Sequence, residues 1–156
     1  MHSADIDDVV RILVASGDPK TRACLQEVLE NAGFDVCTEA ATGADAVEAA
    51  LRERPDVFLL DVGATADEAF RAAGDVKESL PQTKVVLLNA AAEEDAVKAA
   101  ARIGADGYLP EGVHTARLPE IIRAVVAGEA AYPRGLLAPL LGGLSATTNP
   151  ERRSET

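Results

Sequence analysis

The feature that most constrains the fold of this chain is a fivefold alternation between short apolar runs and longer amphipathic stretches. The short runs are rich in Val, Ile and Leu, as strands buried on both faces of a sheet usually are. The longer stretches repeat apolar residues every three or four positions, which indicates helices with one buried face. Because parallel strands need long crossover connections, this alternation predicts an α/β fold with a five-stranded parallel sheet and helices on both faces.

The expected elements follow from these runs and from the residues that bound them. We predict strands at residues 11–15, 34–40, 56–61, 84–89 and 106–110, and helices at residues 18–33, 43–55, 66–80, 93–104 and 116–128. Asp18 and Pro19 mark the start of the first helix, because Asp is a favoured N-cap and Pro suits the first helical turn. We divide the chain into an acidic N-terminal tail, a single domain and a linker or C-terminal tail, at residues 1–8, 9–132 and 133–156.

The composition argues against direct binding to nucleic acid. The chain has 15 Lys and Arg against 26 Asp and Glu, a net charge of −11, whereas nucleic-acid binding depends largely on cationic side chains that neutralise phosphates. Cys24 and Cys37 lie in apolar stretches without metal-ligand spacing, so we interpret both as small buried hydrophobic residues. We find no signal peptide and no apolar run of membrane-spanning length, which predicts a cytoplasmic protein that does not contact membranes.

Functional residues are expected where the strands end, because ligands of open parallel sheets bind at the carboxyl edge. The residues at these positions are Ser16, Gly17, Asp18, Asp61, Asn89, Ala90, Pro110 and Glu111. Asp61 is distinctive among them because it is a carboxylate that closes the apolar run FLLD. From the pattern alone, Asp61 is either a functional carboxylate or an ordinary polar residue at the end of a strand.

Four segments of the chain resemble landmarks of bacterial response-regulator receiver domains. They are RILVASGDPKTR, PDVFLLDV, KVVLLNA and GADGYLP, and they occur in the family's order. The similarity extends over residues 9–132, and IGADGYLP and EIIRAVVAGEAAY are most similar to receivers attached to LuxR-type helix-turn-helix output domains. The resemblance implies a flavodoxin-like (βα)5 receiver fold and a role in two-component, phosphorelay signal transduction and transcription regulation.

The resemblance also implies which positions carry the family's chemistry. Asp61 corresponds to the phosphoacceptor. Two acids after the first strand would hold magnesium, and a hydroxyl residue and a lysine after the fourth and fifth strands would complete the switch. In this chain the positions of the two acids, the hydroxyl and the lysine are occupied by other residue types: Ser16, Gly17, Asn89 and Glu111.

Three further positions have two interpretations each. Asp18 lies one place beyond the acid pair, where we interpret it as the N-cap of the first helix rather than as a metal ligand. Tyr108 occupies the position of the family's switch aromatic, whose ring either changes rotamer on activation or simply covers the edge of the core. Glu111 points either inward, where it would repel Asp61 and raise the carboxylate pKa values, or outward into solvent.

We interpret the chain as an atypical receiver, or pseudo-receiver, that is not an enzyme and has no catalytic residues, cofactor or metal. Mg²⁺ prefers several hard oxygen ligands, and Asp61 alone supplies too few. Phosphoryl transfer would also lack the lysine that neutralises the charge on an aspartyl phosphate. Asp61 is then an unused phosphoacceptor retained for structural reasons, through hydrogen bonds to Ser16 or Asn89. Asn89 is otherwise an ordinary turn residue.

This interpretation implies regulation by phosphorylation-independent dimerisation or by a protein partner or small-molecule ligand. We expect a homodimer that forms near the fourth helix and fifth strand, or through the last helix around residues 117–123. DNA would be contacted only through an output domain that this chain does not contain, so the chain is either a truncated regulator or a stand-alone module.

Three alternatives remain open from the sequence. The first is a conventional receiver phosphorylated on Asp61 by a histidine kinase, with Asp18 replacing a lost metal ligand. The second is a small-molecule sensor with a pocket lined by Ser16, Asp61 and Asn89. The third, a flavodoxin-like nucleotide binder, is disfavoured because the first loop contains only Gly17 and no glycine-rich phosphate cradle.

Overall fold

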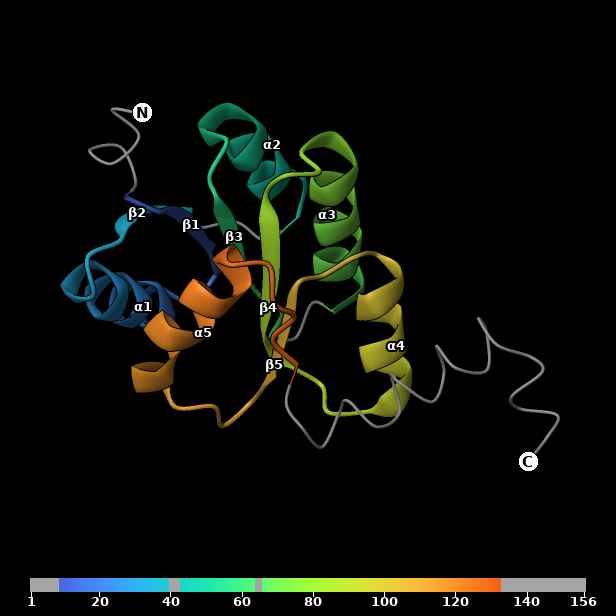
Figure 1. Ribbon diagram of the computed structural model, residues 1–156. Coiled ribbons are helices and arrows are strands. Elements are labelled where there is room, and N and C mark those ends of the chain that lie inside the picture. The colour runs from blue at the N-terminus through green and yellow to red at the C-terminus, as the bar shows by residue number, and fades with distance from the viewer. Residues whose placement is uncertain (1–8, 40–42, 64–65, 133–156) are drawn as a thin grey trace, which may run out of the picture.

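The computed structural model describes residues 9–39, 43–63 and 66–132, which form a parallel sheet between two layers of helices (Figure 1). The strands are β1 (Arg11–Ala15), β2 (Asp35–Glu39), β3 (Val57–Asp61), β4 (Lys84–Ala90) and β5 (Gly107–Pro110), in the spatial order β2-β1-β3-β4-β5. The helices are α1 (Pro19–Asn31), α2 (Ala44–Glu53), α3 (Ala66–Ser79), α4 (Glu94–Arg102) and α5 (Leu118–Val126), and a short 3₁₀ helix, η2 (Thr115–Arg117), directly precedes α5. The predicted α/β fold is confirmed, and each expected element is present with small shifts at its ends.

The predicted N-terminal tail and the predicted linker after residue 132 lie outside the described residues. Among the helices that the structure describes, none is both long and apolar enough to span a membrane.

The two faces of the sheet are covered by different helices. α1 and α5 lie on one face, and α2, α3 and α4 lie on the other (Figure 1). Because successive residues of a strand point to opposite faces, Ile12 of β1 packs in one cluster with Leu25 of α1 and Ile122 of α5. Leu13, the next residue, packs on the other face with alanines of α2 and α3. Each face of the sheet therefore has its own apolar core.

The central strand, β3, is buried along its whole length because it has a strand on each side and a helical layer on each face. Asp61, its last residue, pairs with Leu88 of β4. On the other side, Ala15, the last residue of β1, pairs with Leu60, the residue before Asp61. The residues that follow these partners are Ser16 and Asn89. The register therefore places Ser16 and Asn89 on either side of Asp61 at the carboxyl edge of the sheet.

Helix α1 begins as predicted from Asp18 and Pro19. Asp18 is the N-cap, and its carboxylate accepts hydrogen bonds from the Lys20 N–H at 3.1 Å and from the Thr21 hydroxyl at 2.8 Å. The bond from Lys20 satisfies a backbone donor that has no partner within the first turn. The chain leaves the helix at Gly33, whose φ of +97° suits glycine.

The prediction that both cysteines are small buried hydrophobic residues is wrong. Cys24 is exposed and Cys37 is half-buried. On α1 the buried stripe is formed by Leu25 and Leu29, and Cys24 lies one position from Leu25, about 100° around the helix. Cys37 lies on β2, an edge strand with a neighbouring strand on one side only. Apolar surroundings in the sequence therefore did not determine burial at either position.

Candidate functional site

Three polar side chains meet at the carboxyl edge of the sheet, where β1, β3 and β4 end. Ser16 follows β1, Asp61 ends β3 and Asn89 lies near the end of β4; we call these three residues the carboxylate cluster. Ser16 is fully buried and Asp61 is 9% exposed. Burial of polar groups is unfavourable unless they are hydrogen-bonded, so their partners determine what this edge can do.

Both carboxylate oxygens of Asp61 accept hydrogen bonds from uncharged side chains. The Ser16 hydroxyl donates to Oδ2 at 2.7 Å, and the Asn89 amide donates from Nδ2 to Oδ1 at 2.8 Å. Ser16 is held in turn, because its Oγ accepts a hydrogen bond from the Asp18 N–H at 3.1 Å. The two hydrogen bonds considered for a structurally retained Asp61 are therefore both present.

Asn89 reaches Asp61 at an irregular point of β4. The register of β4 with β5 shifts between Leu88 and Ala90, and Asn89 has a φ of +54°. Asn tolerates this left-handed region better than most residues, and a bulge changes the direction of the side chain it contains. Asn89 is thus hydrogen-bonded to Asp61 and lies in an irregular part of β4 rather than in a turn.

The remaining candidate positions are not brought into the carboxylate cluster. Asp18 is exposed and caps α1. The hydrogen bond from the Thr21 hydroxyl, followed by that from the Lys20 N–H, lowers the pKa of Asp18 below its ordinary value of 3.8. Gly17 and Glu111 are both exposed. Of the two orientations considered for Glu111, the structure shows the outward one.

Tyr108, at the position of the switch aromatic, is fully buried with its ring directed inward. Its hydroxyl donates to the carbonyl of Ala91 in the loop between β4 and α4, and burial raises the pKa of its phenol. The ring stacks on Tyr132, with centroids 5.9 Å apart and planes 10° apart. It also packs edge-on against Phe70, at 6.4 Å between centroids.

The part played by Tyr132 was not predicted from the sequence. Its hydroxyl donates to the carbonyl of Ala105 at 2.9 Å, and burial, followed by the nearby charge of Asp106, raises the pKa of its phenol to about 12. One signal in the sequence could have indicated this contact. The chain contains two tyrosines, and because buried aromatic rings tend to pair, Tyr132 was a candidate partner for Tyr108.

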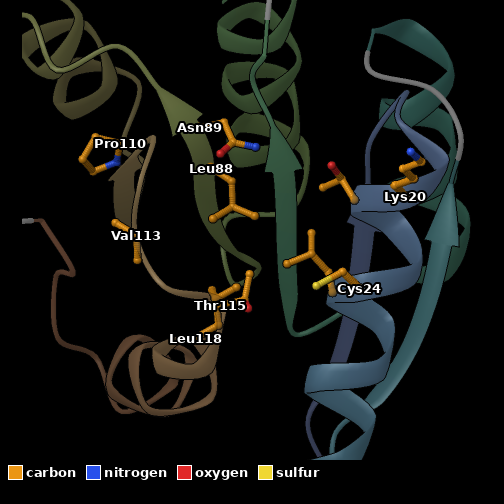
Figure 2. Close-up of a pocket in the computed structure, with 10 residues that line it drawn as sticks. Lys20, Cys24, Leu88, Asn89, Pro110, Val113, Thr115 and Leu118 are labelled. Carbon is orange, nitrogen blue, oxygen red and sulfur yellow. The ribbon is translucent and has the colours of Figure 1, made fainter.

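A cleft of about 270 Å³ opens beside the carboxylate cluster, on the face of the sheet covered by α1 and α5 (Figure 2). Its lining comes from α1, from the end of β4 and from the segment between β5 and α5: Lys20, Thr21, Cys24, Leu25, Leu88, Asn89, Pro110, Val113, Thr115 and Leu118. Asn89 belongs to both the cleft and the carboxylate cluster, whereas Ser16 and Asp61 do not line the cleft. The sequence did not predict this lining because its members come from separate segments of the chain.

The carboxylate cluster does not fit a magnesium ion. Mg²⁺ takes several oxygen ligands in near-octahedral geometry, whereas Asp61 is the only carboxylate of the cluster and each of its oxygens already accepts one hydrogen bond, from the Ser16 hydroxyl and the Asn89 amide. The amide N–H group is a donor and presents hydrogen atoms rather than lone pairs. Within the part of the chain that the structure describes, no three His, Cys, Asp or Glu side chains are grouped so that they could hold a metal.

The strand order, the helices on both faces and the aspartate that ends β3 define a flavodoxin-like (βα)5 domain. The chain belongs to the response-regulator receiver domain family, whose model, described as the response regulator receiver domain, matches residues 12–123. Receiver domains of response regulators are signalling domains.

The chain is similar in sequence to transcriptional regulatory proteins from bacteria. It is 35% identical over 127 residues to the uncharacterized transcriptional regulatory protein YxjL of Bacillus subtilis, covering 80% of this chain and 58% of that protein. It is 32% identical over 109 residues to the transcriptional regulatory protein PdtaR of Mycobacterium tuberculosis, covering 69% of this chain and 53% of that protein. The match thus spans little more than half the length of these relatives.

Solved structures of receivers have the same fold. The receiver domain of the putative response regulator NarL from Mycobacterium tuberculosis is 27% identical, with a TM-score of 0.70 and coverage of 78% of this chain and 98% of that chain. A LuxR-family response regulator from Aurantimonas sp. has a TM-score of 0.77 and covers 86% of this chain and 97% of its own. Its identity of 20% supports the fold alone.

Proposed function

We propose that this chain is an atypical receiver domain that transmits a signal without phosphorylation of Asp61. Its state is set by dimerisation or by the binding of a protein partner or ligand, and it performs no catalysis of its own. Its role is in transcription regulation, which the names of the relatives YxjL and PdtaR support, and we expect it to act in the cytoplasm. Contact with DNA would be made through an output domain rather than through the receiver itself.

The observation that carries this proposal is the occupation of both Asp61 oxygens by neutral donors, Ser16 and Asn89. In phosphoryl transfer to a carboxylate, one oxygen attacks phosphorus while cations neutralise the charge that develops. The partners of Asp61 carry no positive charge, and each of its oxygens already donates electron density to a neutral hydrogen-bond donor. The arrangement therefore favours a structural carboxylate over a phosphoacceptor.

The replacements act together on the same step. Ser16 and Gly17 remove the acid pair, Asn89 removes the hydroxyl, and Glu111 puts a negative side chain where the resemblance implies a positive one. Groups that act as a unit in catalysis are strongly non-additive, so one surviving member does not restore the function of the others. We therefore expect phosphorylation of Asp61 to be negligible at a physiological rate.

The direct test is incubation of the protein with acetyl phosphate and Mg²⁺, followed by intact mass measurement. We expect no Mg²⁺-dependent adduct and no thermal shift with beryllofluoride, while a receiver that has all five family residues reacts under the same conditions. A phosphate adduct that forms on the native chain and disappears in Asp61→Asn would overturn the proposal. It would establish instead the conventional receiver that a histidine kinase phosphorylates.

Small-molecule sensing is the form of ligand control that the cleft supports, although only Asn89 of the three residues expected to line such a pocket, Ser16, Asp61 and Asn89, lines this cleft. The cleft provides a defined volume beside the carboxylate cluster, and Asn89 is part of both. A molecule in the cleft can therefore contact a residue that is bonded to Asp61.

A further inference from the structure

We propose that the cleft between α1 and the β5–α5 segment binds a small organic monoanion with an apolar body, of the aryl-carboxylate class. This inference rests on the proposed function, because it names the ligand and the site through which a phosphorylation-independent receiver is controlled. The cleft adjoins the position where the family's chemistry occurs and shares Asn89 with it, whereas Ser16 and Asp61 do not line it.

The volume and the apolar lining of the cleft indicate the size and polarity of the ligand. Pockets for small molecules usually enclose about 300–1,000 Å³, so a cleft of about 270 Å³ suits a molecule with a single ring rather than a nucleotide. Leu25, Leu88 and Leu118 line it and are otherwise buried in the core, at 2%, 6% and 1% exposure. Because these leucines expose so little surface, most of the apolar area that a ligand can cover comes from the exposed Cys24 and the half-buried Val113. A flat apolar body would displace water from that area.

The charged side chain at the edge of the cleft indicates the charge of the ligand. Lys20 lies in the first turn of α1, where the helix dipole also favours an anion. Its ammonium forms no hydrogen bond or ion pair with any residue that the structure describes, whereas Lys77 and Lys98 are both ion-paired. Asp18 caps the same helix end, and the Lys20 ammonium also acts on its carboxylate, so Asp18 offsets part of the positive field. The field that remains favours at most a single negative charge and disfavours a phosphate dianion.

The opposite wall offers a second polar contact. Figure 2 shows Thr115 and Val113 on the segment that leads into α5, across the cleft from Cys24 on α1. The hydroxyl of Thr115 has no hydrogen-bond partner among the residues that the structure describes. A monoanion with a polar substituent at its far end can therefore contact both walls.

Asn89 connects the cleft to the rest of the domain. Its amide Nδ2 donates one hydrogen bond to Asp61, so its carbonyl oxygen and its second N–H are left for a ligand. Two residues further along, the carbonyl of Ala91 accepts the hydrogen bond from the buried Tyr108 hydroxyl. A ligand that shifts Asn89 therefore acts on the start of the β4–α4 loop, without any change at Asp61 beyond its hydrogen bond.

The test is a titration of the ¹⁵N-labelled full chain with 4-hydroxyphenylacetate, followed by backbone amide shifts. We expect shifts at the cleft residues, with weaker binding of the neutral 4-hydroxyphenylacetamide and no comparable shifts with inorganic phosphate. Lys20→Gln should weaken the acid about two- to fivefold, as for loss of one exposed ion pair, and leave the amide unchanged. Lys84→Gln, at the opposite end of the sheet on β4, is the matched control and should change neither.

A second pair of variants tests the location. Cys24→Phe fills the cleft from α1 and should abolish the shifts, whereas Ala23→Phe places the same ring at an exposed neighbouring position that does not line the cleft. Binding that survives Cys24→Phe would overturn the assignment of the site. Shifts at the cleft that depend on protein concentration, without added probe, would show that a second copy of the chain occupies it and would overturn the ligand class.

Failure of this inference differs from failure of the proposed function. If the titration gives no cleft shifts and acetyl phosphate gives no adduct, only the ligand site is wrong. If acetyl phosphate gives an adduct on Asp61, the proposed function is wrong whatever the titration shows.

Discussion

The Asn89 amide donates a hydrogen bond to Asp61 Oδ1 at 2.8 Å from a residue whose backbone φ is +54°. Asn89 thus combines a side-chain hydrogen bond with a left-handed backbone, and substitutions can change one of these features without the other. The hydrogen bond also places the residue at the family's hydroxyl position in direct contact with the aspartate, with an amide donor in place of a hydroxyl.

Two substitutions of Asn89 separate these features. Asn89→Ala and Asn89→Gly both remove the hydrogen bond to Asp61, but alanine is also strained at positive φ. We expect Asn89→Ala to unfold at lower denaturant concentration than Asn89→Gly, with a difference in the free energy of unfolding of about 1 kcal/mol. Urea titrations of the two variants measure this difference. Greater stability of the alanine variant would show that position 89 does not adopt the left-handed conformation in solution.

Removal of the other donor to Asp61 should destabilise the fold. Ser16→Ala leaves Oδ2 of the carboxylate and the Asp18 N–H without their partner, and an unsatisfied buried polar group costs about 1–3 kcal/mol. Ser79→Ala, at an exposed site at the end of α3, is the control and should stay within about 0.5 kcal/mol of the native chain. Equal unfolding midpoints for the two variants would contradict a structural role for the Ser16–Asp61 bond.

The N-cap of α1 should make stability depend on pH in the acid range. Hydrogen bonds from Thr21 and Lys20 lower the pKa of Asp18 below 3.8, so the folded state favours the ionised carboxylate. The contribution of Asp18 is present above pH 3.8 and is lost as the pH falls through its lower folded pKa. We expect the stability difference between the native chain and Asp18→Asn to shrink in that window. Asp18→Ser, which caps without titrating, should show no such dependence of its own.

Tyr132 should produce the opposite dependence at high pH. Its pKa is raised from 10.0 to about 12, which means that the folded state favours the protonated phenol. Its contribution to stability is present below pH 10 and is lost as the pH rises through about 12. Tyrosinate absorbance of the folded chain should therefore stay low at pH 10 and appear on unfolding in urea. Tyr132→Phe, which removes the bond to Ala105, should cost about 0.5–1.5 kcal/mol at neutral pH.

Self-association is expected through α5. Val126 is an exposed apolar residue on this helix, at 38%, and Leu51 is a comparable one on α2, at 40%. If α5 forms the dimer, the mass measured by light scattering should rise toward twice the chain mass with concentration. Val126→Glu should prevent the rise and Leu51→Glu should not. A monomeric mass at high protein concentration in the native chain would rule out the dimer.

The sequence by itself determined the order of the elements and the residues at the strand ends. Strands buried on both faces read as apolar runs, and Asp18 followed by Pro19 marks a helix start, because both patterns depend on local geometry. Parallel strands end at one edge, so Ser16, Asp61 and Asn89 were predicted to lie together before any side chain was placed. The sequence also shows directly that the positions of the family's acid pair and lysine hold other residue types, because this requires only the identity of each residue.

Only the tertiary structure decided how those side chains interact. The amide of Asn89 reaches Asp61 through a register shift in β4, and the ring of Tyr108 is held inward by Tyr132, a residue beyond the last helix. Cys24 is exposed beside the cleft because α1 turns Leu25, not its neighbour, toward the sheet. These features depend on how separate segments are placed against one another, and periodicity along one segment carries no information about that placement.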